Sequence, residues 1–369
     1  MSSQQRKSYS DLKVTTEKGY SKSIQDLLNN TVLGTPGKLR YKHTETEKNI
    51  EKLSNLSFIQ IRKRERVLGT AGFIERNITL NDTFVKALYV RYLSVYNPFK
   101  NLGNSKTNIK PDKKPNALRS SIEEIFNREL EKPFKSVNQT GIYYAYVEAD
   151  NLLSFNLCKS FGFNPIRIIN TFLFSRFFPK EKKEISVVKK ERHSAFRESL
   201  NHFYRDHNFV FSDSLDDYGS CFELKKNEEA IAGIRAIPVH WKIIELPGLK
   251  GFLMLKILPR IPLFKKLFNP EELRFLAFDS LWYKEGNSDK ISDLMEHACS
   301  LLDYNLGMVW QDEESFTAEE ILSSNNLGFL HKLNGKVSAH LMTREINMSK
   351  ENYSALKNKP AFVSAIDMI

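Results

Sequence analysis

A strand-like run, a short helix and a glycine follow one another between residues 141 and 163, and this order constrains the fold more than any other stretch. Residues 141–147 are apolar and rich in aromatic and β-branched side chains, which predicts a buried strand. Asn151 follows this strand, and an amphipathic stretch then leads to Gly162 and Phe163. A glycine often ends a helix as its C-cap, and Phe163 would return the chain to the core. The segment therefore predicts a helix packed on a sheet.

Two strand-like segments precede this unit. Residues 67–76 are typical of two strands or one bent strand, with Gly69 and Gly72 where backbones approach closely. Residues 87–95 alternate between apolar and polar side chains and contain several aromatic and β-branched residues, which predicts a central strand. The first half of the chain is therefore expected to build an α/β fold with a mixed (α+β) sheet.

These segments together resemble the late half of the GNAT family of acyl-CoA N-acyltransferases, whose pattern reads Asn, a small residue, Leu-Tyr and then Gly-Phe. The resemblance implies a mostly antiparallel, twisted sheet with a splayed parallel strand pair and flanking helices. It also implies that acyl-CoA is the co-substrate and that Asn151 and Ser154 contact its pantetheine arm. An asparagine between a strand and a helix suits this role because its amide and the unpaired backbone groups can bond an extended amide-bearing ligand. An ordinary strand, helix and strand with a glycine cap is the alternative.

The family places a phosphate-binding loop after the central strand, with the pattern Arg or Gln, two residues, Gly, one residue, Gly or Ala. Residues 97–105 are a degenerate version of this loop, in which Lys100, Gly103 and Ser105 fall on the key positions. The loop amides and the following helix N-terminus would bind the pyrophosphate of coenzyme A. Residues 113–116, Lys-Lys-Pro-Asn, are a second candidate cradle because a helix is expected to begin there. A basic, solvated loop without a ligand is the ordinary alternative.

The reaction that the resemblance implies is direct transfer from a thioester to an amine. Its oxyanion would be stabilised by a backbone N–H on a bulge of the central strand, which by position falls at Leu93, Ser94 and Val95. The general base would be a carboxylate near the amine, and Glu75 and Glu148 are candidates because they end or interrupt the flanking strands. Carboxylates at strand ends are more often solvated or paired with a cation, and this alternative stays open.

Cys158 stands where many members of the family have the tyrosine that protonates the departing thiolate. A thiol has little advantage as this acid because its pKa lies close to that of the leaving group. Cys158 is therefore expected to be an apolar filler, with Tyr144 or Tyr89 as other sources of the proton. Loss of activity is a further interpretation of the missing tyrosine.

The second half of the chain repeats the order of elements. A hairpin is expected over residues 220–237, a central strand over 273–283, a helix over 291–303 and another strand over 306–311. This succession resembles a second, diverged copy of the same unit. The copy lacks a clear phosphate loop and a matching asparagine, so it is expected to bind coenzyme A poorly or not at all and to shape the acceptor pocket.

The length of 369 residues suits two domains. The expected division is a disordered N-terminus over residues 1–8, a GNAT-like domain with the acyl-CoA site over 9–178, a charged linker over 179–193, and a second GNAT-like domain over 194–369. A short strand is expected inside the linker, at residues 185–188.

Charge and cysteine usage limit the classes of partner. The net charge of +11 favours an anionic partner such as the phosphates of coenzyme A, tRNA or an anionic lipid. Three widely spaced cysteines indicate neither a disulfide framework nor a metal site. The polar start of the chain and the lack of a long apolar run indicate neither a signal peptide nor a membrane span, so a cytoplasmic location is expected.

Residues 251–268 are apolar and basic and contain no acid. Such a segment could make peripheral contact with an anionic bilayer. A buried helix broken by Pro259 and Pro262, or a lid over a cleft, is the interpretation that we favour from the sequence.

The leading hypothesis is an N-acyltransferase that moves an acetyl or longer acyl group from coenzyme A to a small amine. Transfer from aminoacyl-tRNA is an alternative, because peptidoglycan-bridge transferases also pair two GNAT-like domains, although the long helical arm typical of them is not expected here. A coenzyme-binding module without catalysis is the third hypothesis. The sequence identifies neither the acceptor nor the oligomeric state.

Overall fold

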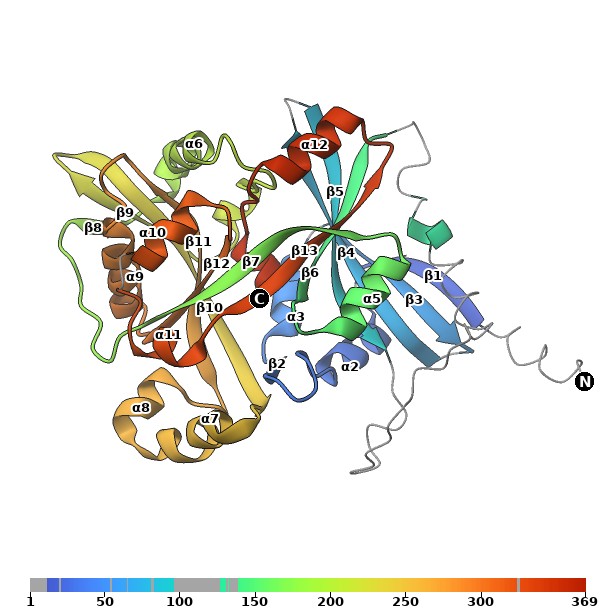
Figure 1. Ribbon diagram of the computed structural model, residues 1–369, viewed down its shortest axis with the longest axis horizontal. Helices are drawn as coiled ribbons and strands as arrows, with labels where there is room; N and C mark the ends of the chain where they lie inside the picture. Colours follow the sequence, from blue (N-terminus) through green and yellow to red (C-terminus); the bar gives the residue numbers. More distant parts are fainter. Residues whose placement is uncertain are drawn as a thin grey trace, which may run out of the picture.

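The computed structural model describes residues 12–19, 21–53, 55–64, 66–80, 83–95, 127–130, 132, 139–323 and 326–369 (Figure 1). Its strands form one 13-stranded sheet with the order β1-β3-β4-β5-β6-β13-β7-β12-β11-β10-β9-β8, and β2 pairs with β10 beside this path. The strands are β1 (Leu12–Lys18), β2 (Arg40–His43), β3 (Leu56–Lys63), β4 (Arg66–Leu80), β5 (Thr83–Val95), β6 (Gly141–Glu148), β7 (Asn164–Ser175), β8 (Ile185–Val187), β9 (Ser220–Lys226), β10 (Glu229–Glu245), β11 (Leu273–Tyr283), β12 (Leu306–Asp312) and β13 (Val337–Ile346).

Helices flank this sheet on both faces. They include α2 (Lys22–Asn29), α3 (Thr46–Glu51), α5 (Leu152–Ser160), α6 (His193–Phe203), α7 (Gly248–Phe252), α8 (Pro262–Leu267), α9 (Lys290–Leu301), α10 (Phe316–Ser323), α11 (Phe329–Asn334), α12 (Lys350–Asn358) and α13 (Ala365–Met368). In Figure 1, α5 covers one face of the first half of the chain, and α9 and α10 lie beside the strands of the second half.

A splayed parallel pair lies at the centre of the first half. Strands β5 and β6 run parallel, and their pairing extends from Lys86 opposite Gly141 to Tyr89 opposite Tyr144. Beyond Tyr89, β5 pairs only with β4, and a bulge places two of its residues, Tyr92 and Leu93, opposite one residue of β4. Tyr92 has a φ of 55°, which turns the strand away from β6.

The second half repeats this geometry. Strands β11 and β12 are parallel from Leu276 opposite Gly307 to Phe278 opposite Val309. A bulge again follows, with Ser280 and Leu281 opposite one residue of β10. Ser280 has a φ of 53°, almost the value found at the first bulge. A mixed, largely antiparallel sheet with two splayed parallel pairs and flanking helices confirms the fold class expected from the sequence.

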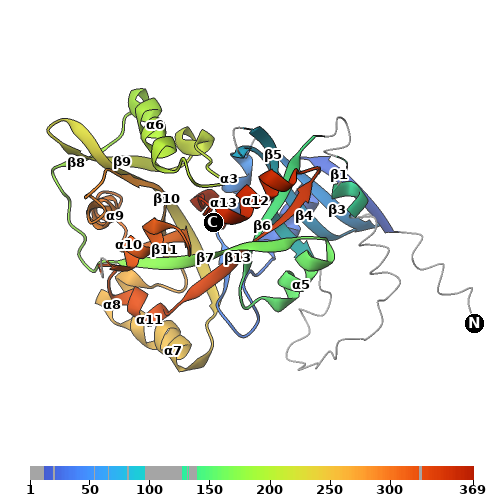
Figure 2. The same ribbon diagram turned by 45° about the horizontal axis from the view of Figure 1, so that its top comes forward.

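Two long strands cross between the halves. Strand β7 follows α5 but pairs with β12 of the second half, and β13 returns to pair with both β6 and β7. Figures 1 and 2 show β7 and β13 side by side, spanning the middle of the molecule. The sheet is therefore continuous, and the division into domains at residues 178 and 194 stays a prediction. The strand expected within 179–193 is present as β8, which pairs with β9 at the sheet edge.

The main hydrophobic core reflects this exchange. It contains buried side chains from both halves, including Tyr89 and Tyr144 from the first and Trp241 and Trp310 from the second. A smaller core lies under α5, where Phe163 packs with Phe73 and Tyr143. The central face of the sheet is thus a shared interior, and polar groups that lie on it are expected to have partners.

The unit that opened the sequence analysis folds as predicted. β6 is followed by α5, and Gly162 takes a φ of +80° immediately after the C-cap residue Phe161. The Phe163 N–H donates to the carbonyl of Cys158 at 3.0 Å, and the Gly162 N–H donates to that of Lys159 at 3.0 Å. These are the two bonds of a Schellman cap, so the glycine ends the helix by the expected mechanism.

Candidate active site

The splay between β5 and β6 is the feature from which the candidate site is built. The two strands separate after Tyr89 and Tyr144, and the bulge leaves β5 with one residue more than β4 can pair. Leu93 is the second residue of this bulge, and Ser94 and Val95 lie just beyond it, aligned with Thr70 and Gly69 of β4. The bulge expected on this strand is therefore present, and it includes the first of the three residues named for the oxyanion contact.

A glycine makes the bulge possible. A Cβ atom at Gly72 would lie 3.0 Å from the Phe58 ring and 3.1 Å from the Tyr92 ring. Any larger residue at this position would push the Tyr92 ring away and disturb the turn of β5. Gly72 therefore lies where backbones approach closely, as the sequence indicated.

A polar cluster occupies the central face beside the splay. Asp367 of α13 is buried, and its carboxylate accepts hydrogen bonds from Arg76 at 2.5 Å and from the Tyr144 hydroxyl at 3.0 Å. The Tyr89 hydroxyl donates to the Asp367 carbonyl, and Arg91 donates to the Ile366 carbonyl at 2.7 Å. Charged and hydroxyl groups of β4, β5 and β6 thus fix the C-terminal segment against the first half, as Figure 2 shows for α13.

Burial controls the protonation of this cluster. Burial raises the pKa of Asp367, while the nearby Arg76 guanidinium and the Tyr144 hydrogen bond act to lower it. Burial also raises the pKa of Tyr144 well above its ordinary value. Both tyrosines that the sequence analysis named as other proton sources, Tyr89 and Tyr144, therefore hold their protons at neutral pH and bond to α13.

Three buried tyrosine hydroxyls around the splay have no hydrogen-bond partner among the described residues: those of Tyr92, Tyr146 and Tyr218. Tyr92 lies on the bulge and Tyr146 on the part of β6 that has separated from β5. Tyr218, with Arg91 and Ile366, lines a cavity of about 10 Å³, which is room for roughly one water molecule. Buried polar groups are normally bonded, so these hydroxyls mark a place where a ligand or water would supply the bond.

Glu148 lies at the end of β6, on the same side of the strand as Tyr144 and Tyr146. Its carboxylate accepts a hydrogen bond from the Thr35 hydroxyl at 2.9 Å. Burial raises the pKa of Glu148 above its ordinary value, while the hydrogen bonds from Thr35 act to lower it. A half-buried carboxylate with a raised pKa beside the splay has the properties of a general base.

Glu75 has a different environment. Its side chain is exposed, and it forms an ion pair of 2.8 Å with Lys86. It lies opposite Leu88, which packs in the core under α5 rather than on the central face. The structure therefore does not bring Glu75 together with Glu148.

Asn151 and Ser154 form the N-cap of α5. The Asn151 side chain accepts a hydrogen bond from the Ser154 N–H at 3.1 Å, and the Asn151 N–H donates to the Glu148 carbonyl at 2.9 Å. The cap places both residues at the end of β6, next to the splay. Lys100, Gly103 and Ser105, and the alternative cradle at residues 113–116, lie outside the described residues.

Replacing Asn151 separates its two roles. Asn151→Ala should lower the free energy of unfolding by about 0.5–2 kcal/mol through loss of the cap, and weaken coenzyme A binding by about 1–2 kcal/mol if the amide also contacts pantetheine. Asn151→Ser keeps a capping oxygen, so it should retain stability and still lose affinity. Calorimetry with coenzyme A and urea denaturation measure the two quantities. Unchanged affinity in both variants would remove Asn151 from the site.

Cys158 packs among apolar side chains under α5, with Val90, Phe155 and Phe161 in the same cluster. Burial raises the pKa of its thiol to about 11. At neutral pH the thiol is therefore protonated and weakly reactive, as expected of a filler residue.

Cys158→Ala should accordingly keep most of any transfer activity, because an inert thiol contributes little to the reaction. Single-turnover transfer to a panel of amines tests this expectation. A rate loss of ~10²-fold with intact coenzyme A affinity would instead identify the thiol as the acid that protonates the leaving group.

The second splay is occupied by the chain itself. Asp279 and Arg91 occupy corresponding positions, because each directly precedes the first bulge residue of its strand. Asp312 in β12 likewise corresponds to Glu148 in β6 when the two parallel pairs are aligned. Both aspartates bind the C-terminal segment: the Ala361 N–H donates to Asp312 at 2.8 Å and the Ala365 N–H donates to Asp279 at 2.7 Å. One continuous segment therefore bridges β11 and β12 where the first half has its splay.

Buried arginines hold these two aspartates in place. Arg235 donates to both oxygens of Asp279 at 2.7 and 2.6 Å, and Arg167 donates to both oxygens of Asp312 at 2.7 and 2.8 Å. In the first half, by contrast, Arg91 and Glu148 are bonded to two different segments, at Ile366 and Thr35. Among the described parts of the chain, one segment is hydrogen-bonded to both Asp279 and Asp312 in the second splay, and no segment is hydrogen-bonded to both Arg91 and Glu148 in the first.

Three residues of the polar cluster, Arg76, Arg91 and Asp367, were not predicted from the sequence. A charged residue on a strand face that is otherwise apolar indicates a buried, paired charge, and both Arg76 and Arg91 have apolar neighbours two positions away on either side. No such signal exists for Asp367, which meets Arg76 across 291 positions of sequence.

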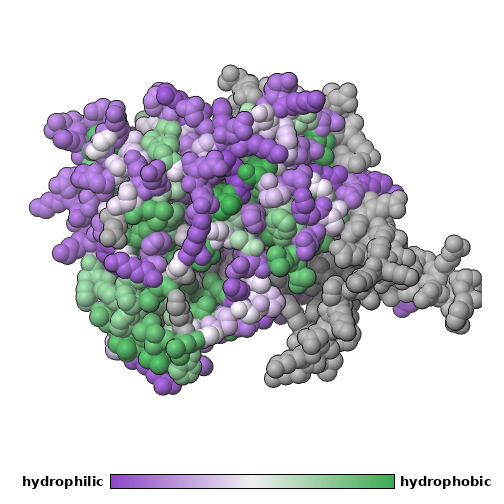
Figure 3. Space-filling view, in the orientation of Figure 1, coloured by the Kyte–Doolittle hydropathy of each residue, from purple (hydrophilic) through white to green (hydrophobic). Residues whose placement is uncertain are grey.

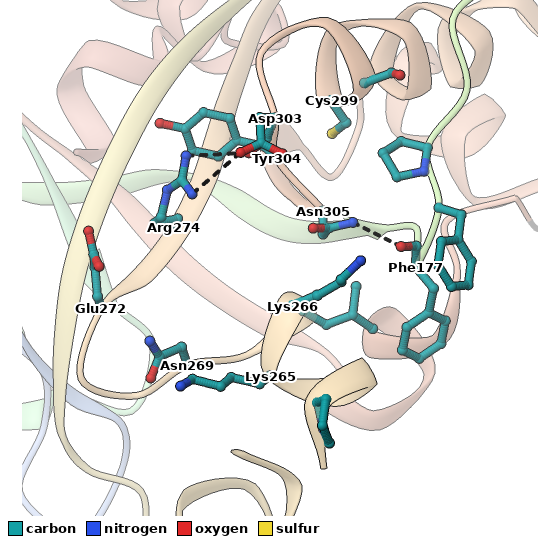
Figure 4. Close-up of a pocket in the computed structure, with 15 residues that line it drawn as sticks. Phe177, Lys265, Lys266, Asn269, Glu272, Arg274, Cys299, Asp303, Tyr304 and Asn305 are labelled. Atoms are coloured by element: carbon teal, nitrogen blue, oxygen red, sulfur yellow. Dashed lines mark hydrogen bonds and ion pairs between the residues drawn. The ribbon is translucent and has the colours of Figure 1, made fainter. Parts of the chain in front are cut away.

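Three other features bear on ligands. The described residues contain no group of three or more His, Cys, Asp or Glu placed to hold a metal ion. Within the same residues, no helix is both long and apolar enough to cross a bilayer. A cavity of about 660 Å³ lies away from the splay, between the chain after β7, α8 and the start of β11 (Figure 4).

The sequence matches no family model and no curated protein, but solved structures share its fold. Saccharomyces cerevisiae N-myristoyltransferase with bound myristoyl-CoA aligns at a TM-score of 0.55 and 10% identity, covering 96% of this chain and 89% of that one. The same enzyme with myristoyl-CoA and inhibitors aligns at a TM-score of 0.56 and 11% identity, covering 96% and 86%. A conserved protein of unknown function from Enterococcus faecalis V583, described as a probable N-acyltransferase, aligns at 0.48 and 10% identity over 91% and 73%, too low a score to support an argument. The chain therefore shares the fold of these N-myristoyltransferase structures, a mixed α/β sheet with flanking helices of the class that the sequence predicted.

Proposed function

We propose that this protein is an acyl-CoA-dependent N-acyltransferase whose coenzyme lies in the splay between β5 and β6. The observation that carries the proposal is the difference between the two splays. The second is bridged by residues 361–365 through Asp312 and Asp279. At the first, Arg91 and Glu148 bond two different segments, and three tyrosine hydroxyls around the splay have no partner among the described residues. The two N-myristoyltransferase structures with this fold contain myristoyl-CoA, which supports an acyl-CoA as the co-substrate.

In the proposed reaction, the lone pair of an acceptor amine attacks the thioester carbonyl carbon. A C–N bond forms, the C–S bond breaks, and the thiol of coenzyme A is released. The amine loses one proton to a base, a role that we assign to Glu148, and the departing thiolate takes up one proton. Backbone N–H groups at the Tyr92–Leu93 bulge would stabilise the oxyanion, because the bulge frees a donor from the strand ladder.

A series of coenzyme A thioesters from acetyl to myristoyl, each offered with a panel of amines, is the direct measurement of which acyl length is transferred. Release of the free coenzyme A thiol reports transfer, and a control without amine reports hydrolysis.

One coenzyme A should bind per chain, in the first half. Isothermal calorimetry gives the stoichiometry, and a matched pair of variants gives the place. Asn151→Ala should weaken binding, whereas Ser315→Ala should not. Ser315 is the matched control because it occupies the corresponding position after β12. Its N–H donates to the Asp312 carbonyl at 3.0 Å, as the Asn151 N–H donates to the Glu148 carbonyl at 2.9 Å.

Three results would contradict the proposal. A stoichiometry of two would indicate a second coenzyme site, and a loss of affinity in Ser315→Ala alone would indicate that the coenzyme binds the second half. Binding of bulk tRNA with a steep salt dependence, together with no binding of coenzyme A or its thioesters, would favour an aminoacyl-tRNA-dependent transferase instead.

A further inference from the structure

Residues 248–268, here called the α7–α8 segment, expose an apolar surface. Leu249 is 84% exposed and Phe252 is 56% exposed. The other exposed large apolar side chains of the segment are Leu253, Ile257, Ile261 and Leu263. Figure 3 shows a hydrophobic region at the lower left of the molecule, in the place where Figure 1 has α7 and α8. Clustered exposed apolar side chains of this kind mark an interaction surface.

The fold of the segment accounts for this exposure. α7 passes into a π-helical turn at Leu253–Ile257, and Pro259 and Pro262 divide the rest into short helices. Leu258, Leu267 and Phe268 are buried and attach the segment to the body of the protein. The segment is therefore neither a buried helix nor a free loop: one side is anchored, and the other carries apolar side chains into solvent.

Exposed cations accompany these side chains. Lys256, Arg260, Lys265 and Lys266 are all exposed, and no acid occurs between residues 248 and 268. Of the acids that flank the segment in sequence, Glu271 is paired with Lys242 at 2.7 Å and Glu245 with Arg40 at 3.1 Å, and Glu272 lines the cavity beside the segment. The segment therefore combines apolar and positively charged groups on one exposed surface.

The cavity of about 660 Å³ borders this surface. Pro262, Lys265 and Lys266 of α8 belong to its wall, and Arg274 lies on the opposite side. In Figure 4 the Lys266 side chain extends toward Asn305 and Phe177, whereas Lys265 lies toward Asn269. Arg274 donates a hydrogen bond of 3.3 Å to the Asp303 carbonyl. Lys265 and Lys266 are therefore the cations that belong both to the cavity wall and to the exposed surface of the α7–α8 segment.

We propose that the α7–α8 segment docks on an anionic lipid bilayer. Its apolar side chains would enter the boundary between headgroups and acyl chains, and its lysines and arginine would bind lipid phosphates. The charge of the segment decides between occupants. A neutral apolar partner would not need the four exposed cations, and two copies of the segment would repel each other.

Flotation with lipid vesicles tests this inference on the full chain. Vesicles of equal parts phosphatidylcholine and phosphatidylglycerol should bind the protein, whereas pure phosphatidylcholine vesicles should bind it about tenfold more weakly or not at all. The double variant Leu249→Ser/Phe252→Ser and the double variant Lys265→Glu/Lys266→Glu should each lower the fraction bound by about tenfold or more. Both pairs of side chains are exposed, so the thermal midpoint should stay unchanged.

Matched controls and the alternative occupants complete the experiment. Leu322→Ser, which alters a side chain of α10 that is 52% exposed, and Lys226→Glu, at the exposed last residue of β9, should bind vesicles like the unmodified protein. Equal binding to neutral and anionic vesicles would overturn the proposal. So would failure to bind either kind, or a lipid-free dimer in sedimentation velocity that Leu249→Ser/Phe252→Ser converts to a monomer.

Discussion

Replacing Glu148 by glutamine should lower the single-turnover rate of acyl transfer by ~10²-fold or more, while the affinity for coenzyme A stays nearly unchanged. Glutamine keeps the size of the side chain and can still accept a hydrogen bond from Thr35, so the fold should be retained. It cannot accept the proton of the amine. This outcome rests on the proposed function, because it requires an amine that attacks at the end of β6.

The pH dependence gives an independent readout. Burial raises the pKa of Glu148, and only its ionised form is a base, so the rate of the unmodified protein should fall as the pH decreases through this raised pKa. The Glu148→Gln variant should lack this acidic limb. Glu75→Gln is the matched control, because Glu75 is exposed and paired with Lys86. An equal loss in Glu75→Gln, or an unchanged rate in Glu148→Gln, would contradict the assignment of the base.

Replacing Asp279 by leucine should lower the free energy of unfolding by about 3–5 kcal/mol. The substitution leaves the fully buried Arg235 guanidinium without the carboxylate that it binds through two hydrogen bonds. It also removes the acceptor of the Ala365 N–H, which holds the C-terminal segment in the second splay. Urea denaturation measures the loss, and limited proteolysis should show earlier cleavage near residues 359–369.

Two further variants identify the cause of this loss. Glu271→Gln removes an exposed ion pair with Lys242 and should cost no more than about 1 kcal/mol. Adding Arg235→Met to Asp279→Leu removes the uncompensated charge and should restore a large part of the stability. A loss below about 1 kcal/mol in Asp279→Leu would show that this pair does not hold the centre of the fold.

The elements around the first splay were predictable because each depends on neighbours in sequence. The strand 141–147, the cap at Asn151 and the turn at Gly162 follow from side-chain alternation, a short polar side chain and the absence of a Cβ atom. The second half was predictable for the same reason, and β11 and β12 lie where the pattern placed them. The GNAT resemblance added the splay, which no local pattern encodes.

Other parts of the site depend on contacts between distant residues, and local patterns could not supply them. Glu75 and Glu148 both end or interrupt strands, yet one pairs with a lysine in solvent and the other is half-buried beside the splay. Their difference arises from which face of the sheet each side chain occupies and from what packs on that face. For residues 251–268, burial was favoured, and the structure shows one buried side and one exposed side.

By itself, the sequence determined the order of the elements, the two central strands and the net positive charge, because these depend on short-range periodicity and composition. The tertiary structure decided that β7 and β13 exchange between the halves and that residues 361–365 occupy the second splay. It also brought Asp367 to Arg76 and Tyr144. The physical reason is that a buried charge or backbone donor must find a partner, and in this chain the nearest suitable partner is often more than 80 residues away in sequence.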